Sequence, residues 1–184
     1  MLKPALLLAA LFTLTSCSTP RNFYVLSPAG KGPSRGGIGI GVGPVDVANY
    51  LTERPYLVFQ SSPNKMEISD LHEWAGDLSD NFSRVLATNL GRHKNTGNVR
   101  TYPWDHEDDL KYQISIDIRQ FHGTAEGDAI LEASWRIYSL PESRLVTSKT
   151  TTLHEPLGGD GFEALVAAQS RLIDKLALTI AKQL

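Results

Sequence analysis

Histidines, clustered carboxylates and one cysteine are the side chains through which this sequence could bind a metal ion or perform nucleophilic or acid–base chemistry. The acidic stretch at residues 105–109 could offer oxygen ligands to calcium, but it lacks the glycine and the ligand spacing of an EF-hand loop. Serines are scattered, and there is no G-x-S-x-G motif. No two histidines have the H-x-x-x-H spacing of a metal site; the five are His72, His93, His106, His122 and His154. We therefore predict no catalytic residue, no metal site and no enzymatic activity.

The only cysteine, Cys17, could be a nucleophile, a metal ligand, a buried core residue or an attachment point. It ends a segment in which Lys3 supplies a positive charge and residues 5–14 form an apolar run as long as that of a signal peptide. This run is too short to cross a bilayer as a stable helix. A catalytic thiol would need a base and electropositive surroundings, whereas Cys17 lies at the end of a segment that is expected to be removed. We interpret Cys17 as an attachment point.

The quartet L-T-S-C at residues 14–17 resembles the bacterial lipobox. The resemblance implies covalent diacylglycerol on the Cys17 sulfur, cleavage before Cys17 and an N-acyl lipid on the new amino terminus. A single acyl chain binds a membrane reversibly, so several chains together give lasting attachment. Residue 18 is serine rather than the aspartate that commonly retains such lipoproteins in the inner membrane. The resemblance therefore implies a lipid anchor in the outer membrane, on its periplasmic side.

Length and charge set the domain organisation and limit the classes of partner. We expect a signal peptide at residues 1–16, a lipidated tether at 17–22 and a single periplasmic domain at 23–184. A chain of this length can bury a sizeable core without disulfides or metals. The formal net charge is −2, with no basic stripe or polybasic patch. We therefore expect no nucleic-acid partner, and no electrostatic binding to lipid heads.

The first half of the domain predicts four strands and a helix. The strands are expected at residues 23–26, 37–47, 55–60 and 65–69. The second of them, GIGIGVGPVDV, has one face made only of glycines, which permits another part of the chain to approach closely. Pro44 breaks the G-x-G-x-x-G spacing of a phosphate loop. The helix should begin at Ser69 or Asp70, with Glu73 completing a capping box, and end at Gly91.

On this helix we expect Trp74 to be a core or interface residue. We expect His72 on the polar side of the helix and His93 in the loop after it, both of them solvated.

The second half predicts further strands and a long final helix. Alternating apolar and polar residues at 111–119 indicate a strand with one buried face, and residues 131–137 should form its partner. A short strand is expected at 99–102 and a further strand at 145–154. Asp160 should cap the last helix, with Glu163 three residues on. The grouping of strands predicts an α+β fold: one mixed, mainly antiparallel sheet with two main helices packed on one face.

Several short motifs, in order, resemble those of one family. They are Phe23–Leu26, the run VGPVDVANYL at 42–51, Arg54-Pro55, Trp74-Ala75 with Leu78, and IRQF at 118–121. Following a lipobox, they resemble the PqiC/YmbA family of ABC-type transport auxiliary lipoproteins. Each motif is weak alone, but together they span nearly the whole mature chain.

The resemblance implies a docking or conduit subunit at the outer-membrane end of a transport system. Its implied partners are an MCE-domain protein and the associated ABC permease complex, which are implicated in lipid trafficking between the two membranes. It also implies a homo-oligomer, as a ring. No cofactor is expected beyond the covalent lipid on Cys17.

Four residues are candidate interface residues on this interpretation: Tyr50, Leu51, Pro55 and Trp74. An apolar loop between strands is costly to leave in water, which favours contact with a partner. The alternative is that Tyr50 and Leu51 close the core beneath the first strands.

Two other functional classes remain open from the sequence. A lipid- or ligand-binding lipoprotein would carry cargo in its own apolar cavity between helix and sheet. A docking subunit would instead have a filled core and an apolar outer patch. An envelope hydrolase would need a cleft that joins a nucleophile to a base.

Overall fold

The computed structural model describes residues 20–105 and 109–184. The predicted signal peptide, Cys17 and residues 106–108 of the acidic stretch lie outside the described residues. The strands are β1 (Asn22–Tyr24), β2 (Ile40–Val47), β3 (Tyr56–Ser62), β4 (Lys65–Trp74), β5 (Val99–Thr101), β6 (Tyr112–Thr124), β7 (Asp128–Ser139) and β8 (Arg144–Pro156). The helices are α1 (Asn49–Thr52), α2 (Leu78–Lys94) and α3 (Gly161–Ala181).

All eight strands belong to one mixed sheet built around β6. Along one side β6 pairs antiparallel with β7, which in turn pairs antiparallel with β8. Its other side pairs in parallel with β2 and, near its end, with β3. The strands β1 and β5 extend the sheet through short parallel pairings with β4 and β2. The long pairings are antiparallel, so the predicted α+β class is confirmed.

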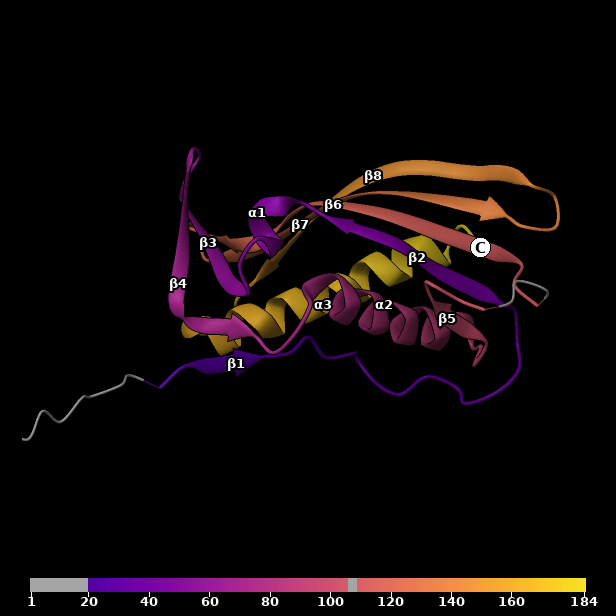
Figure 1. The fold of residues 1–184 in the computed structure, drawn as a ribbon, viewed down its shortest axis with the longest axis horizontal. Helices are drawn as coiled ribbons and strands as arrows, with labels where there is room; N and C mark the ends of the chain where they lie inside the picture. The colour runs from indigo at the N-terminus through magenta and orange to yellow at the C-terminus, as the bar shows by residue number, and fades with distance from the viewer. Residues whose placement is uncertain (1–19, 106–108) are drawn as a thin grey trace, which may run out of the picture.

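The two long helices lie on the same face of this sheet (Figure 1). The predicted alternation in β6 is confirmed, because Ile114, Ile116 and Ile118 are buried at 0–2% exposure. Across the interface, Phe82 of α2 meets Phe121 of β6 edge to face, with ring centroids 5.5 Å apart. Such aromatic pairs stabilise a core beyond their buried area. Large apolar side chains therefore fill the space between helices and sheet.

The glycine face at the start of β2 is covered by Trp104 and Asp109, which lie between β5 and β6 in the chain. A Cβ added at Gly39 would lie 1.9 Å from the backbone oxygen of Asp109, and one at Gly41 would lie 2.8 Å from the Trp104 ring. The expected close approach is therefore confirmed, and the approaching residues, Trp104 and Asp109, belong to neither a helix nor a strand. At this point in the sheet only glycine leaves room for them.

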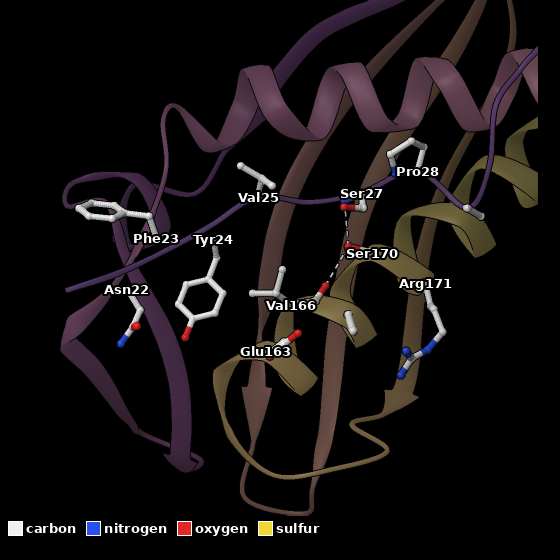
Figure 2. A pocket seen from close by; sticks show the side chains of 12 residues that line it. Asn22, Phe23, Tyr24, Val25, Ser27, Pro28, Glu163, Val166, Ser170 and Arg171 are labelled. Carbon is white, nitrogen blue, oxygen red and sulfur yellow. Dashed lines mark hydrogen bonds between the residues drawn. The ribbon is translucent and has the colours of Figure 1, made fainter. Parts of the chain in front are cut away.

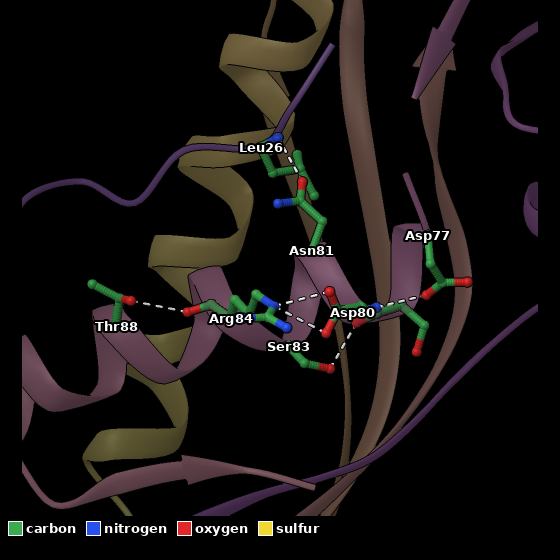
Figure 3. A network of polar contacts seen from close by, with 8 residues as sticks. Leu26, Asp77, Asp80, Asn81, Ser83, Arg84 and Thr88 are labelled. Atoms are coloured by element: carbon green, nitrogen blue, oxygen red, sulfur yellow. Dashed lines mark hydrogen bonds and ion pairs between the residues drawn. The ribbon is translucent and has the colours of Figure 1, made fainter. Parts of the chain in front are cut away.

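The start of α2 differs from the prediction. Residues 69–74 continue β4, and the helix begins at Leu78. Asp77 is the N-cap, and its Oδ1 accepts a hydrogen bond of 2.7 Å from the Asp80 amide (Figure 3). The predicted capping box of Asp70 and Glu73 is wrong because this stretch pairs with β1 and β3 on its two sides.

The end of α2 also differs. The helix continues through Gly91 to Lys94, and Asn95 ends it in the left-handed conformation at φ 50°. Gly91 serves packing instead, because a Cβ there would lie 2.8 Å from the Thr96 carbonyl oxygen. In α3, Asp160 is the N-cap residue as predicted, but its side chain makes no capping hydrogen bond.

Between β1 and β2, residues 25–39 form a strap that runs along the two helices on the side away from the sheet (Figure 1). The Leu26 amide donates to Asn81 Oδ1 of α2 at 2.7 Å (Figure 3), and the Ser27 amide donates to Ser170 Oγ of α3 at 3.1 Å. Farther along, the Ala29 amide donates to Asn89 Oδ1 of α2 at 3.0 Å. The helices thus lie between the sheet and the strap.

Candidate functional site

Two of the four candidate interface residues are buried. Leu51, in the short helix α1, is 2% exposed, and Trp74, at the end of β4, is 6% exposed. Both belong to the main hydrophobic core. The burial of Leu51 agrees with the alternative that this residue closes the core beneath the first strands. Trp74 lies on a strand rather than on the predicted helix.

The other two candidates lie at the surface. Tyr50 is 39% exposed, and Pro55 is exposed at the start of β3. The Pro55 carbonyl accepts a hydrogen bond of 2.6 Å from the Trp74 amide, which ties the loop to β4. The Tyr50 hydroxyl donates to the Arg119 carbonyl at 2.9 Å. Burial, reinforced by the Glu132 carboxylate, raises the pKa of Tyr50 to about 12.

Beneath Tyr50 lies His122, a buried residue that the sequence pattern did not single out. It is 1% exposed, its ring centroid is 6.3 Å from that of Tyr50, and its Nδ1 lies 2.9 Å from the Gly123 carbonyl oxygen. Burial lowers the pKa of His122, although the hydrogen bond to Gly123 opposes this shift. The sequence did contain an indication of its burial. His122 follows the alternating run at 111–119 by three residues and lies on an extension of the same strand, β6.

His72 and His93 both make structural contacts, so the expectation that they are solvated is wrong. The His72 ring stacks on Phe162 of α3 with centroids 4.0 Å apart, and its Nδ1 is hydrogen-bonded to the Tyr24 hydroxyl at 2.7 Å. The His93 Nε2 lies 2.8 Å from Asp174 Oδ1, and Arg92 pairs with the same carboxylate. His93 therefore joins α2 to α3.

The N-terminal edge of the domain is held where the predicted tether ends. Arg21 forms an ion pair of 2.9 Å with Glu73 of β4. Next to it, β1 pairs in parallel with β4, with Phe23 opposite Glu73 and Tyr24 opposite Trp74. Burial and the Glu163 carboxylate raise the pKa of Tyr24. Arg21 and Glu73 are 52 residues apart in sequence, so no local pattern indicates that they pair.

A groove of about 680 Å³ lies between this N-terminal segment and α3 (Figure 2). Val166 adds an apolar side chain to its wall, and Glu163, Ser170 and Arg171 add polar groups. Figure 2 shows Tyr24 pointing toward α3, whereas Phe23 points away from it. This groove lies outside the core between helices and sheet.

Within residues 20–105 and 109–184, no group of three or more histidine, cysteine, aspartate or glutamate side chains is placed to hold a metal ion. Across the same ranges, no helix combines the length and apolar character needed to cross a bilayer.

Comparison with known proteins identifies a family model and similar folds. The model described as "ABC-type transport auxiliary lipoprotein component" matches residues 24–181. That description names a transport component rather than a class of enzyme. An uncharacterized protein of known crystal structure aligns with a TM-score of 0.74 at 19% identity, over 89% of this chain and 98% of its own. Protein XCC0632 from Xanthomonas campestris, of the family DUF330, aligns with a TM-score of 0.65 at 17% identity, over 86% of this chain and 92% of its own.

Proposed function

The chain belongs to the family of ABC-type transport auxiliary lipoprotein components, and on that premise we propose that it is the docking or conduit subunit of an MCE-type ABC transport system. In this role it contacts an MCE-domain protein and the ABC permease complex, and it takes part in lipid trafficking between the two membranes. The observation that carries the proposal is the family match, which covers almost the whole of the described domain.

The filled core supports docking over carriage of cargo between helix and sheet. Phe82, Phe121 and Trp135 are each exposed by 2% or less in that layer. Apolar side chains are instead exposed on the outside, among them Phe23, Tyr50 and Ile68. Exposed apolar residues are typical of contact surfaces when they form contiguous patches.

The proposal includes a lipid anchor on Cys17, in the outer membrane and facing the periplasm. It rests on the lipobox and on Ser18 in the sequence. It also includes self-association, as a ring. In support, β8 pairs only with β7 along the described chain, so the part of its edge before His154 is open to a second copy. At the end of β8, the carbonyls of His154 and Pro156 accept hydrogen bonds from Lys175 and Arg171 of α3.

Crosslinked pull-down from membranes tests the proposal. We expect an MCE-domain protein and an ABC permease to co-purify with the wild-type lipoprotein. Capture of unrelated envelope proteins alone would contradict it. Cys17→Ser should move the protein out of the membrane fraction, which checks the anchor separately.

The candidate interface is tested in the same assay. Tyr50→Ala should reduce recovery of the MCE-domain protein, whereas Leu178→Ala should leave it unchanged. Leu178 is a suitable control because it is 41% exposed on α3, close to the 39% of Tyr50. Equal recovery with both variants would remove Tyr50 from the interface.

A second candidate function is that of a lipid- or ligand-binding lipoprotein, and the groove beside α3 favours it. Its volume of about 680 Å³ is in the range of ligand sites, and its wall combines apolar and charged groups. Native mass spectrometry of the purified lipoprotein would detect a ligand as added mass beyond the covalent lipid. Substitution of Val166 by a bulkier residue should abolish that added mass.

A further inference from the structure

Three apolar side chains are exposed at the edge of the sheet next to the tether. Phe23 is 62% exposed, Val25 57% and Leu71 38%. Phe23 pairs with Glu73, so Leu71, two residues before Glu73, lies on the same face of the β1–β4 pair as Phe23. Figure 2 shows Tyr24 pointing toward α3, whereas the side chains of Phe23 and Val25 point away from α3. We call these three residues the edge patch.

The edge patch is close to the predicted anchor because the chain is fixed almost from the start of the described residues. Arg21 is held by Glu73 at 2.9 Å, and Asn22 already pairs with His72. Cys17 precedes Arg21 by four residues. An extended chain spans at most about 3.6 Å per residue, so the Cα atoms of Cys17 and Arg21 lie within about 14 Å of each other.

We propose that the edge patch rests on the phospholipid bilayer that holds the Cys17 anchor. This inference depends on the acylation of Cys17 included in the proposed function. With the acyl chains in the bilayer, the short tether keeps the patch at the level of the head groups. An aromatic and two aliphatic side chains are suited to that boundary, where apolar groups leave water at shallow depth.

The charges beside the patch are compatible with a lipid surface. Arg21 and Glu73 form an ion pair and together contribute no net charge. This pair therefore does not repel anionic head groups. Contact through this edge also orients the domain, because the turn between β7 and β8 lies at the opposite end of the molecule (Figure 1).

The single cysteine makes a direct test possible. Once the Cys17 sulfur carries its lipid, an introduced cysteine is the only free thiol in the chain. Phe23→Cys and, as a second position, Val25→Cys place a spin label on the patch. Leu178→Cys is the matched control, because it is 41% exposed near the end of α3 and lies outside the β8 edge proposed for self-association. Each labelled, full-length lipoprotein is reconstituted into phospholipid vesicles.

Electron paramagnetic resonance then measures collisions with oxygen, which concentrates in the bilayer, and with a water-soluble nickel chelate. We expect the ratio of oxygen to nickel accessibility to be severalfold higher at positions 23 and 25 than at position 178. Equal ratios at all three positions would overturn the proposal. Labels at 23 and 25 that are immobilised and shielded from both reagents would also overturn it, since a protein would then cover the patch.

The mass of the N-terminal peptide from the same samples separates this inference from the proposed function. A lipidated Cys17 with a water-exposed label at position 23 would reject contact of the patch with the bilayer but leave the anchored docking subunit intact. A Cys17 without lipid would reject both.

Discussion

The Arg21 guanidinium lies 2.9 Å from the Glu73 carboxylate, and this pair joins the end of the predicted tether to β4. The two side chains differ in environment, since that of Arg21 is 57% exposed and that of Glu73 only 8%. A mostly buried carboxylate needs a charged or hydrogen-bonding partner to offset its desolvation. The predicted tether itself supplies that partner, so Arg21 contributes to the stability of this edge of the sheet.

Removing the Arg21 side chain should therefore destabilise the domain. Arg21→Ala leaves Glu73 without its partner, and we expect the free energy of unfolding to fall by about 1 kcal/mol, moderated by the exposure of Arg21. Urea unfolding measures this, and hydrogen exchange should show faster exchange in β1.

A second ion pair provides the control for this change. Arg144 and Glu142 also form an ion pair, but both side chains are more than half exposed. Arg144→Ala should leave the stability within a few tenths of a kcal/mol. An equal loss in the two variants would show that the burial of Glu73 is not the cause.

Gly39→Ala should be strongly destabilising. Its Cβ would lie 1.9 Å from the Asp109 backbone oxygen, so the segment between β5 and β6 must move. We expect a loss of at least about 1–3 kcal/mol, the usual cost of overpacking. Thermal unfolding measures it. Gly159→Ala is the control, because its Cβ would meet the nearest atom at an ordinary 3.7 Å, and a matching loss there would exclude a steric cause.

Neighbouring residues of α1 should respond differently to substitution. Leu51→Ala removes a side chain that is 2% exposed, and we expect a loss of about 2–5 kcal/mol from the free energy of unfolding. Tyr50→Phe removes only the hydrogen bond to Arg119 and should cost about 0.5–1.5 kcal/mol. Denaturant titration of both variants measures the difference. Similar losses would contradict the assignment of Leu51 to the core and Tyr50 to the surface.

His122 should make the domain less stable in mild acid. Its folded-state pKa is lowered from the usual 6.5, so below pH 6.5 the unfolded chain takes up a proton that the folded chain resists. Since the unfolded state then binds more protons, the free energy of unfolding falls as the pH drops from 6.5 toward the folded-state pKa. Urea unfolding at a series of pH values measures this slope.

His122→Asn should flatten this pH dependence, because the amide can donate near the position of Nδ1 but does not titrate in this range. His154→Asn is the matched control, because His154 is exposed on β8. An unchanged acid slope in His122→Asn would assign the effect to other groups.

The regular patterns in the sequence predicted most of the fold. The alternation around Ile114, Ile116 and Ile118 located β6 and its buried face, and the apolar stripe after Asp160 located α3. Both signals are local, because the periodic spacing of apolar residues involves only the residues of a single strand or helix. The same patterns could not reveal Arg21 with Glu73 or Tyr50 over His122, since these contacts join residues that are far apart in the chain.

The stretch from Ser69 to Trp74 shows why a local signal can fail. Asp70 and Glu73 have the spacing of a capping box, yet the chain there is a strand. It pairs with β3 on one side and with β1 on the other, and these tertiary pairings override local helix signals. Of the candidate site, the sequence left open whether Tyr50 and Leu51 contact a partner or close the core, and the structure places Tyr50 at the surface and Leu51 in the core. The burial of Trp74 depended on the same pairings.

The strap also has a consequence for the order in which the chain folds. Its bond from the Ser27 amide to Ser170 spans 143 residues, whereas its bonds to Asn81 and Asn89 span 55 and 60. Contacts between residues so distant in sequence form late, because a long loop must close first. The bond to Ser170 can form only once α3, which follows the strap by more than 120 residues, is in place. The strap therefore docks fully only at that stage, which in the proposed lipoprotein leaves Cys17 accessible to the enzymes that would acylate and cleave it.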